Sequence, residues 1–141
     1  MGTTKDGLNA PQGDGLSPQD RSNWTVQQWT HYTEAPLGKS QGGKDLAGGN
    51  FAGAKLHFAN LEGADLERAY LVGAHLGCAN LKGANLKGAN LWKANLLCAD
   101  LRGADLRGVD LTWTLLKGAN LEGANLEGHD LDDLRKRVAG F

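Results

Sequence analysis

The sequence predicts an all-β solenoid, and the spacing of residues in 44–133 supports this prediction. An apolar residue stands at every fifth position from Leu46 to Leu131, without a gap. A small residue, usually Ala, lies two positions before it, and Asn or Asp usually lies directly before it. Gly usually lies two positions after it, so that the consensus of the eighteen copies is Ala-Asn/Asp-Leu-x-Gly. The segment is therefore an array of five-residue repeats.

A period of five fits neither a helix nor a long flat strand. On a helix, each repeat advances the central residue by ~500°, so the leucines would spiral around the cylinder. On a long strand, successive leucines would point to opposite faces. A short extended piece followed by a corner places Ala and Leu on one inward face, while Gly and Asn or Asp supply the turn. A chain that turns at every repeat closes into a coil, and coils stack.

The run over residues 79–91, Ala-Asn-Leu-Lys-Gly-Ala-Asn-Leu-Lys-Gly-Ala-Asn-Leu, resembles the pentapeptide-repeat family. The resemblance covers about ninety residues. It implies a right-handed quadrilateral β-helix with four repeats in each coil, hence about four and a half coils here. It also implies that the central residue and the small residue before it point inward. Many members of this family come from cyanobacteria, so the resemblance favours a bacterial source.

The N-terminal flank predicts a tail and a cover for the first coil. Residues 1–16 have the composition of a disordered tail. Residues 17–43 are expected to form an N-terminal cap and linker, with a helix over 18–34 and a Gly-rich link over 35–43.

The C-terminal flank predicts a second cover, over residues 134–141. The run from Asp132 to Val138 is expected to be a short helix, because acidic residues come first and basic residues last. Leu134, Val138 and Phe141 are expected to face the last coil.

Composition and charge argue against several classes of partner. The chain of 141 residues has a net charge of −1 and no basic stripe, so nucleic acid is not expected to bind. No stretch approaches the ~20 apolar residues of a membrane span. The first residues lack the apolar region of a secretory signal. We therefore expect a cytoplasmic protein that contacts no membrane.

Motifs for catalysis are missing as well. No serine belongs to a nucleophile motif, and a convex tube offers no obvious cleft for a small-molecule substrate. His129 stands at an inward small-residue position, where packing or a contact with the cap is the simpler role. We expect no enzyme activity, no cofactor and no metal site.

The outer surface has four sides if residues twenty apart stack in columns. Two adjacent sides carry charged residues after the central leucine, in the layer order acidic, basic, basic, acidic: Glu62, Lys82, Arg102 and Glu122 on one, and Glu67, Lys87, Arg107 and Glu127 on the other. We expect opposite charges to pair between neighbouring coils, although exposed ion pairs are worth only ~0–1 kcal/mol.

On the other two sides, bulky side chains replace the consensus Asn, Asp or Gly or occupy the variable position after the central residue. The candidate partner-binding residues among them are Phe58, Tyr70, Val72, Trp92, Leu97, Trp113 and Leu115. A tube this thin cannot bury Trp, and exposed apolar patches with Trp and Tyr usually mark contacts. Two alternatives remain for what covers this patch. One is another protein, including a second copy in a homodimer, and the other is the chain's own segment with Trp24, Trp29 and Tyr32.

Cys78 and Cys98 are twenty residues apart in equivalent positions, so we expect them to be vertical neighbours. Their Cα separation would then be ~5 Å, within the range of a disulfide. They are a candidate redox pair. Reduced structural thiols, which a cytoplasmic setting favours, are the main alternative, and a metal pair lacks the usual zinc spacing.

These observations predict a non-enzymatic protein-binding, scaffolding or regulatory module that presents an aromatic-rich side of a solenoid. The family resemblance implies an alternative, because some pentapeptide-repeat proteins imitate the shape and charge of DNA and protect DNA gyrase. Those proteins are long acidic rods. Here the repeats have twelve acidic and nine basic residues, so their net field is weak.

Overall fold

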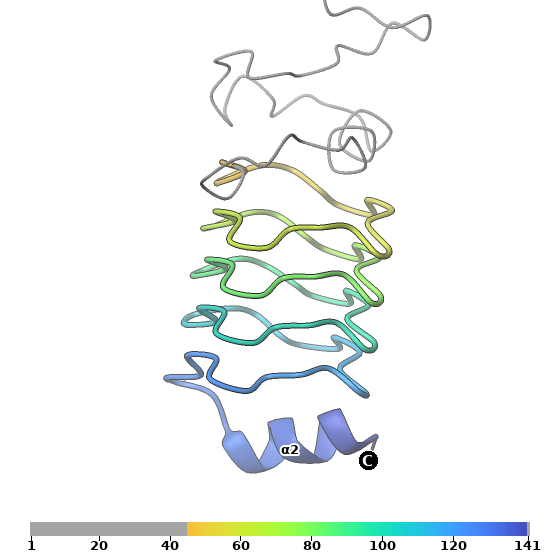
Figure 1. Ribbon diagram of the computed structural model, residues 1–141, viewed down its shortest axis with the longest axis vertical. Coiled ribbons are helices and arrows are strands. Elements are labelled where there is room, and N and C mark those ends of the chain that lie inside the picture. Colours follow the sequence, from red (N-terminus) through yellow and green to blue (C-terminus); the bar gives the residue numbers. More distant parts are fainter. Residues whose placement is uncertain (1–44, 141) are drawn as a thin grey trace, which may run out of the picture.

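The computed structural model describes residues 45–140, in which a stack of coils is closed by one helix, α2 (Leu131–Ala139) (Figure 1). Every backbone bridge is parallel and joins residues twenty apart, from Asp45 with Asp65 to Asp105 with Asn125. A coil therefore contains four repeats. Each bridge is a single residue pair, because the chain turns a corner before a longer strand can form. The expected tail, the expected N-terminal cap and Phe141 lie outside the described residues.

The core consists of the residues that the five-residue period predicts. Every central residue from Leu46 to Leu116 is buried, and most are 2% exposed or less. The small residues two positions earlier are buried beside them. Thr114 stands at one such position, and its hydroxyl donates to Leu91 O at 2.7 Å, so this buried polar group is satisfied. Each fully buried Leu stabilises the fold by ~1.5–3 kcal/mol, which makes the inward columns the main source of stability.

Where the consensus Asn or Asp is present, its side chain fastens the β-turn at the corner. In the repeat centred on Leu91, Asn90 Oδ1 accepts a hydrogen bond from Trp92 N at 3.0 Å. The N–H of Ala94 donates to Leu91 O at 2.9 Å and closes the turn. The third residue of the turn has a positive φ, for example +66° at Gly83, and this is why glycine is the consensus residue there.

Hydrogen bonds join each coil to the coils above and below it. The N–H of Leu81 donates to Asp100 O in the next coil at 2.8 Å. The N–H of Asp100 donates back to Ala79 O at 3.0 Å. Because this pattern repeats along the stack, stability comes from interfaces between neighbouring coils.

Helix α2 begins at Leu131, one residue earlier than the sequence suggested. Asp130 is its N-cap, and the Asp130 side chain accepts from the N–H groups of Asp132 and Asp133. As a result, Leu131 starts the helix and is 48% exposed, although the repeat pattern predicted an inward side chain. No helix within residues 45–140 is long and apolar enough to cross a membrane.

The helix closes the stack with apolar contacts and with hydrogen bonds to the last coil. Leu134 is buried and Val138 packs against the core, as expected. The Arg137 guanidinium donates to Leu111 O at 2.7 Å and to Thr114 O at 2.8 Å. These bonds take the place of a further coil. Val138 O accepts from Gly118 N at 2.9 Å in the same way.

Candidate protein-interaction surface

On the two charged sides, the arginines pair within their own coil. Arg102 forms a two-point ion pair with Asp100, with N–O distances of 2.8 and 2.6 Å, and Arg107 holds Asp105 in the same way. The expectation of ion pairs between coils is therefore wrong for these two sides, because within residues 45–140 no ion pair joins one of their glutamates to a lysine or arginine of the neighbouring coil. The turn already holds the carboxylate two residues earlier beside the arginine. The arginine therefore pairs with this aspartate rather than with a glutamate of a neighbouring coil.

These ion pairs change the titration of the aspartates. Hydrogen bonds from Arg102 lower the pKa of Asp100 to about 2, and those from Arg107 lower the pKa of Asp105 to about 2. The paired carboxylates in turn raise the pKa of each guanidinium. In this one layer of the charged sides, the positive charge of each arginine is therefore compensated by its own aspartate.

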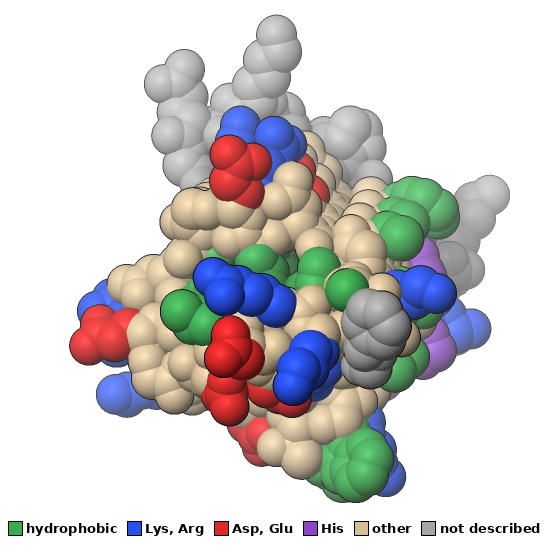
Figure 2. Space-filling view, turned by 90° about the horizontal axis from the view of Figure 1, so that it is seen from below, with side chains coloured by type: hydrophobic (Ala, Val, Ile, Leu, Met, Phe, Trp, Pro, Cys, Tyr) green, Lys and Arg blue, Asp and Glu red, His purple; other side chains and the backbone are tan. Residues whose placement is uncertain are grey.

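On the other two sides, seven side chains form what we call the aromatic surface: Phe58, Tyr70, Val72, Trp92, Leu97, Trp113 and Leu115. Phe58 is 77% exposed and Trp113 is 73% exposed, while Leu115, Tyr70 and Trp92 are exposed to lesser degrees and Val72 and Leu97 are half-buried. In a view along the stack from its C-terminal end, apolar and histidine side chains gather at the right and lower edges (Figure 2).

The coils bring these residues onto neighbouring layers rather than into one cluster. Val72 and Trp92 are twenty residues apart, and the turn that follows Val72 contacts Trp92, because Gly73 N donates to Trp92 O at 2.9 Å. Phe58 lies in the first described coil, well above Trp113, at about 4.8 Å per layer. Among the described residues, no ring–ring contact joins Tyr70, Trp92 and Trp113. The surface is thus extended and ribbon-like.

Lys93 also belongs to this surface, although the sequence did not single it out. Its Nζ lies 4.2 Å from the centre of the Trp92 ring, a cation–π distance. Trp92 is the least exposed of the four aromatic residues of the surface, at 37%. The signal was present in the sequence, because Lys93 replaces a consensus glycine.

The backbone at several of these positions is unfavourable for any residue except glycine. Six non-glycine residues have φ between 55° and 58°, and each stands at the consensus glycine position: Phe58, Arg68, Cys78, Lys93, Cys98 and Trp113. All except Arg68 lie on the two sides that carry the aromatic surface. A side chain in this conformation costs ~1–2 kcal/mol.

The two cysteines are free thiols, and both are exposed. Cys98 leans over the next coil, since a methyl group built on Gly118 would meet its Sγ at 3.1 Å. Both cysteines have positive φ, near 55°. The redox pairing of Cys78 with Cys98 stays a prediction.

Two histidines form a further contact on these sides. The rings of His57 and His75 pack edge to face, with centroids 5.3 Å apart, and both side chains are exposed. They do not form a metal site with their neighbours, since no group of three or more His, Cys, Asp or Glu side chains within residues 45–140 could hold an ion. His129 instead lies inside the last coil, with Nε2 2.6 Å from Leu106 O, which fits a packing role.

Comparison with known proteins identifies the repeats. The family model for pentapeptide repeats matches eight copies within residues 49–88, 74–112 and 84–123, which together span more than half of the chain. Among curated proteins, none matches this chain in sequence.

Several solved structures are similar to this chain. HetL, a pentapeptide repeat protein involved in heterocyst differentiation regulation in the cyanobacterium Nostoc sp. strain PCC 7120, is 44% identical, with a TM-score of 0.55. The match covers 56% of this chain and 37% of HetL, so this chain corresponds to little more than a third of HetL's length. A second Nostoc pentapeptide repeat protein, alr5209, is 35% identical over 64% of this chain and 81% of its own, with a TM-score of 0.49.

QnrB1, a plasmid-mediated fluoroquinolone resistance protein, is 20% identical, with a TM-score of 0.53. The match covers 57% of this chain and 42% of QnrB1, and at this identity it bears on the fold alone. Pentapeptide repeat proteins fold as right-handed quadrilateral β-helices and are generally structural or binding proteins rather than enzymes. The period of five residues, the coil of twenty and the family model agree, and the chain belongs to the pentapeptide-repeat family.

Proposed function

We propose that this protein is a non-enzymatic binding module that recognises a protein partner with its aromatic surface. One observation carries the proposal. Large side chains replace glycine at positions where a side chain strains the backbone, and two of them, Phe58 and Trp113, remain about three quarters exposed. Such exposed side chains add little to folding, so contact with a partner is the simplest reason for their presence.

The chemistry of the surface suits a protein partner. Trp and Tyr are favoured anchors of protein interfaces, and Lys93 beside Trp92 adds a cation to an otherwise apolar ribbon. In this proposal the eighteen repeats make about four and a half coils, and the aromatic surface, from Phe58 to Leu115, extends over roughly 14 Å along the stack. The proposal places the protein in the cytoplasm, where exposed thiols such as Cys78 and Cys98 stay reduced.

The test compares two double variants of the full chain as baits in quantitative pull-downs. We expect Trp92→Ala with Trp113→Ala to lose partners that wild type retains. The matched control, Glu62→Ala with Glu67→Ala, alters a charged side and should retain them. If the tryptophan variant retains every partner, the proposal is wrong. Sedimentation of the same proteins shows whether the partner is a second copy.

The chain's own N-terminal segment is the competing cover for this surface. Hydroxyl-radical footprinting of the isolated monomer separates the two cases. If the surface awaits a partner, Trp113 oxidises readily in the free protein, as its 73% exposure predicts. Strong protection of Trp113 in the monomer would favour the internal cover.

Protection of DNA gyrase is not favoured as a function. The local pairing of Arg102 with Asp100, and of Arg107 with Asp105, breaks up the acidic character that a DNA mimic needs. The likeness to QnrB1 concerns the fold. A gyrase supercoiling assay in the presence of an inhibitor should show no effect of this protein.

A further inference from the structure

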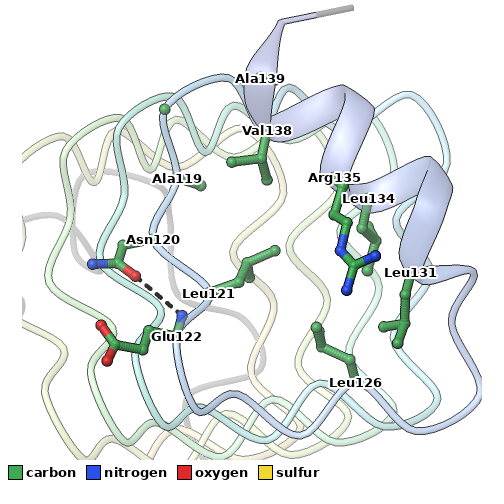
Figure 3. A pocket seen from close by; sticks show the side chains of 11 residues that line it. Ala119, Asn120, Leu121, Glu122, Leu126, Leu131, Leu134, Arg135, Val138 and Ala139 are labelled. Carbon is green, nitrogen blue, oxygen red and sulfur yellow. Dashed lines mark hydrogen bonds between the residues drawn. The ribbon is translucent and has the colours of Figure 1, made fainter.

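The C-terminal end of the stack is only partly closed. Between the last coil and α2 lies an apolar groove of about 730 Å³, with Leu121 and Leu126 on the coil side and Leu131 and Val138 on the helix side (Figure 3). Leu121 and Leu126 are half-buried, whereas Leu101 and Leu106, one coil above them, are 0% and 1% exposed. Helix α2 thus leaves two central leucines of the last coil partly uncovered.

Backbone groups along this groove lack the partners that every coil above provides. One coil higher, the N–H groups of Leu101 and Gly103 donate to carbonyls of the coil below at 2.8 and 2.9 Å. Among the described residues, the corresponding N–H groups of Leu121 and Gly123 have no acceptor, nor has that of Leu126. An unpaired edge of this kind is a template for another extended chain.

The carbonyls of the same edge are free as well. Ala99 O accepts from Asn120 N at 2.9 Å, and Ala104 O accepts from Asn125 N at 2.8 Å. The equivalent carbonyls of Ala119 and Ala124 have no donor within residues 45–140. Donors and acceptors therefore recur at the spacing that a further parallel layer would need.

The charges around the groove are mixed, with Arg135 on the helix side and two glutamates on the outer edge of the last coil. Among the described residues, Glu122 and Glu127 form no ion pair at contact distance, since the arginines above them bind Asp100 and Asp105. Each glutamate still attracts its arginine at longer range and contributes to the raised pKa of Arg102 or Arg107. On the helix side, Arg135 is paired with Asp132 at 3.4 Å. A basic residue in an added layer would lie directly beneath each glutamate.

The same combination occurs inside the protein, where a layer with lysines lies beneath a layer with glutamates. Glu62 and Glu67 stand one coil above Lys82 and Lys87. The next coil also supplies an amide, since Asn80 Nδ2 donates to Glu62 Oε2 at 3.4 Å. The layer formed by residues 79–88 therefore shows what kind of segment would complete the open edge.

We propose that the groove binds an extended segment of another protein, which adds to the stack as a parallel β-layer. The segment carries an apolar residue at every fifth position, with Lys or Arg directly after it. Its apolar side chains cover Leu121 and Leu126, its backbone pairs with the open edge, and its basic residues meet Glu122 and Glu127. This is β-augmentation at the end of a solenoid, and it uses a surface separate from the aromatic one.

The probe for this proposal is a fluorescein-labelled peptide with the sequence of residues 79–88, Ala-Asn-Leu-Lys-Gly-Ala-Asn-Leu-Lys-Gly. Fluorescence polarisation with the full chain should show saturable binding, with a Kd below about 1 mM. A control peptide with both leucines changed to serine should bind at least about tenfold more weakly. The reason is that the lost burial of two leucine side chains in the groove is worth more than about 1.4 kcal/mol.

Variants of the protein locate the site. Glu122→Lys with Glu127→Lys should weaken binding at least about tenfold, and Ala139→Trp, which fills the groove from the end of α2, should do the same. The matched control, Glu62→Lys with Glu67→Lys, makes the same charge change where a layer is already present and should bind as wild type does. Thermal unfolding checks that each variant is folded.

Amide exchange gives a direct readout of the edge. Bound peptide should slow exchange at Leu121, Gly123 and Leu126 in the wild-type protein. The proposal is overturned if no saturable binding occurs below about 1 mM. It is also overturned if the Glu122 and Glu127 variant binds normally, or if the three amides stay unprotected. The Trp92→Ala, Trp113→Ala protein should bind the peptide as wild type does, so failure here leaves the proposed function untouched.

Discussion

The backbone strain at Trp113 can be measured by comparing alanine with glycine at two neighbouring positions. Trp113 has φ of +58°, and Thr112, directly before it in the same turn, is not among the residues with positive φ. Both side chains are exposed. Trp113→Ala and Trp113→Gly lose the same ring, so their difference in stability isolates the effect of the Cβ atom. The pair Thr112→Ala and Thr112→Gly provides the same comparison at an ordinary position.

The expected magnitudes follow from two opposing effects. At position 113 a Cβ atom costs ~1–2 kcal/mol in the left-handed conformation. Glycine avoids this cost but gives the unfolded chain extra freedom, worth ~0.5–1 kcal/mol. Glycine should therefore be the more stable choice at 113 by ~0.5–1 kcal/mol, and the less stable choice at 112 by a similar amount. The two comparisons should differ by ~1–2 kcal/mol, which is the strain itself.

Urea unfolding followed by circular dichroism gives the four free energies of unfolding. The reasoning would be refuted if Trp113→Ala were as stable as Trp113→Gly, since the turn would then tolerate a side chain without strain. The wild-type ring, which is 73% exposed, contacts the protein over only ~60 Å², worth about 1.5 kcal/mol. The free energy of unfolding of Trp113→Gly should thus lie within about 1 kcal/mol of that of wild type. A decrease of more than about 3 kcal/mol would show that other residues cover the ring.

Three further predictions concern the cap, the core and the charged sides. Arg137→Ala should destabilise the protein by about 3 kcal/mol, because it removes two hydrogen bonds from a charged donor to the last coil, and Arg137→Lys should recover part of this loss in urea unfolding. Leu86→Ala in the middle of the stack should cost ~3–5 kcal/mol, whereas Leu126→Ala at the open end should cost less than half as much in the same assay. The folded pKa of Asp100 and Asp105, about 2, lies below the ordinary value of 3.8, so their ion pairs stabilise the fold above pH 4 and this contribution is lost as the pH falls toward 2. The variant Asp100→Asn with Asp105→Asn should lose less stability than wild type over that pH range in thermal unfolding. A loss equal to that of wild type would contradict this account.

The inward columns were predictable from the sequence because they depend on local spacing alone. Ala and Leu two residues apart share a face in any extended piece, and a corner at every repeat turns each Leu toward the same axis. The burial of every central residue from Leu46 to Leu116 follows from this rule. The exposure of Phe58 and Trp113 follows as well, since residues outside the inward pair have no room inside the tube.

Contacts between side chains were harder to predict than positions. The vertical order of Glu and Arg suggested pairing between coils, yet Arg102 binds Asp100 in its own turn. Sequence spacing cannot rank two acceptors at similar distances, because the choice depends on how the turn orients each carboxylate. Leu131 was predicted as a central residue of the last repeat but begins helix α2. The cause is similar, since Asp130 is compatible with both a turn and an N-cap.

The sequence by itself determined the repeat, the inward columns and the two sides on which bulky residues replace the consensus. Only the tertiary structure decided that bulky residues such as Phe58 and Trp113 keep the positive φ of the consensus glycine, and which backbone groups stay unpaired at Leu121 and Leu126. The physical reason is that a five-residue period specifies where each residue lies in a coil. The conformation of a turn and the closure of an end instead depend on the neighbouring coil, or on the helix that replaces it.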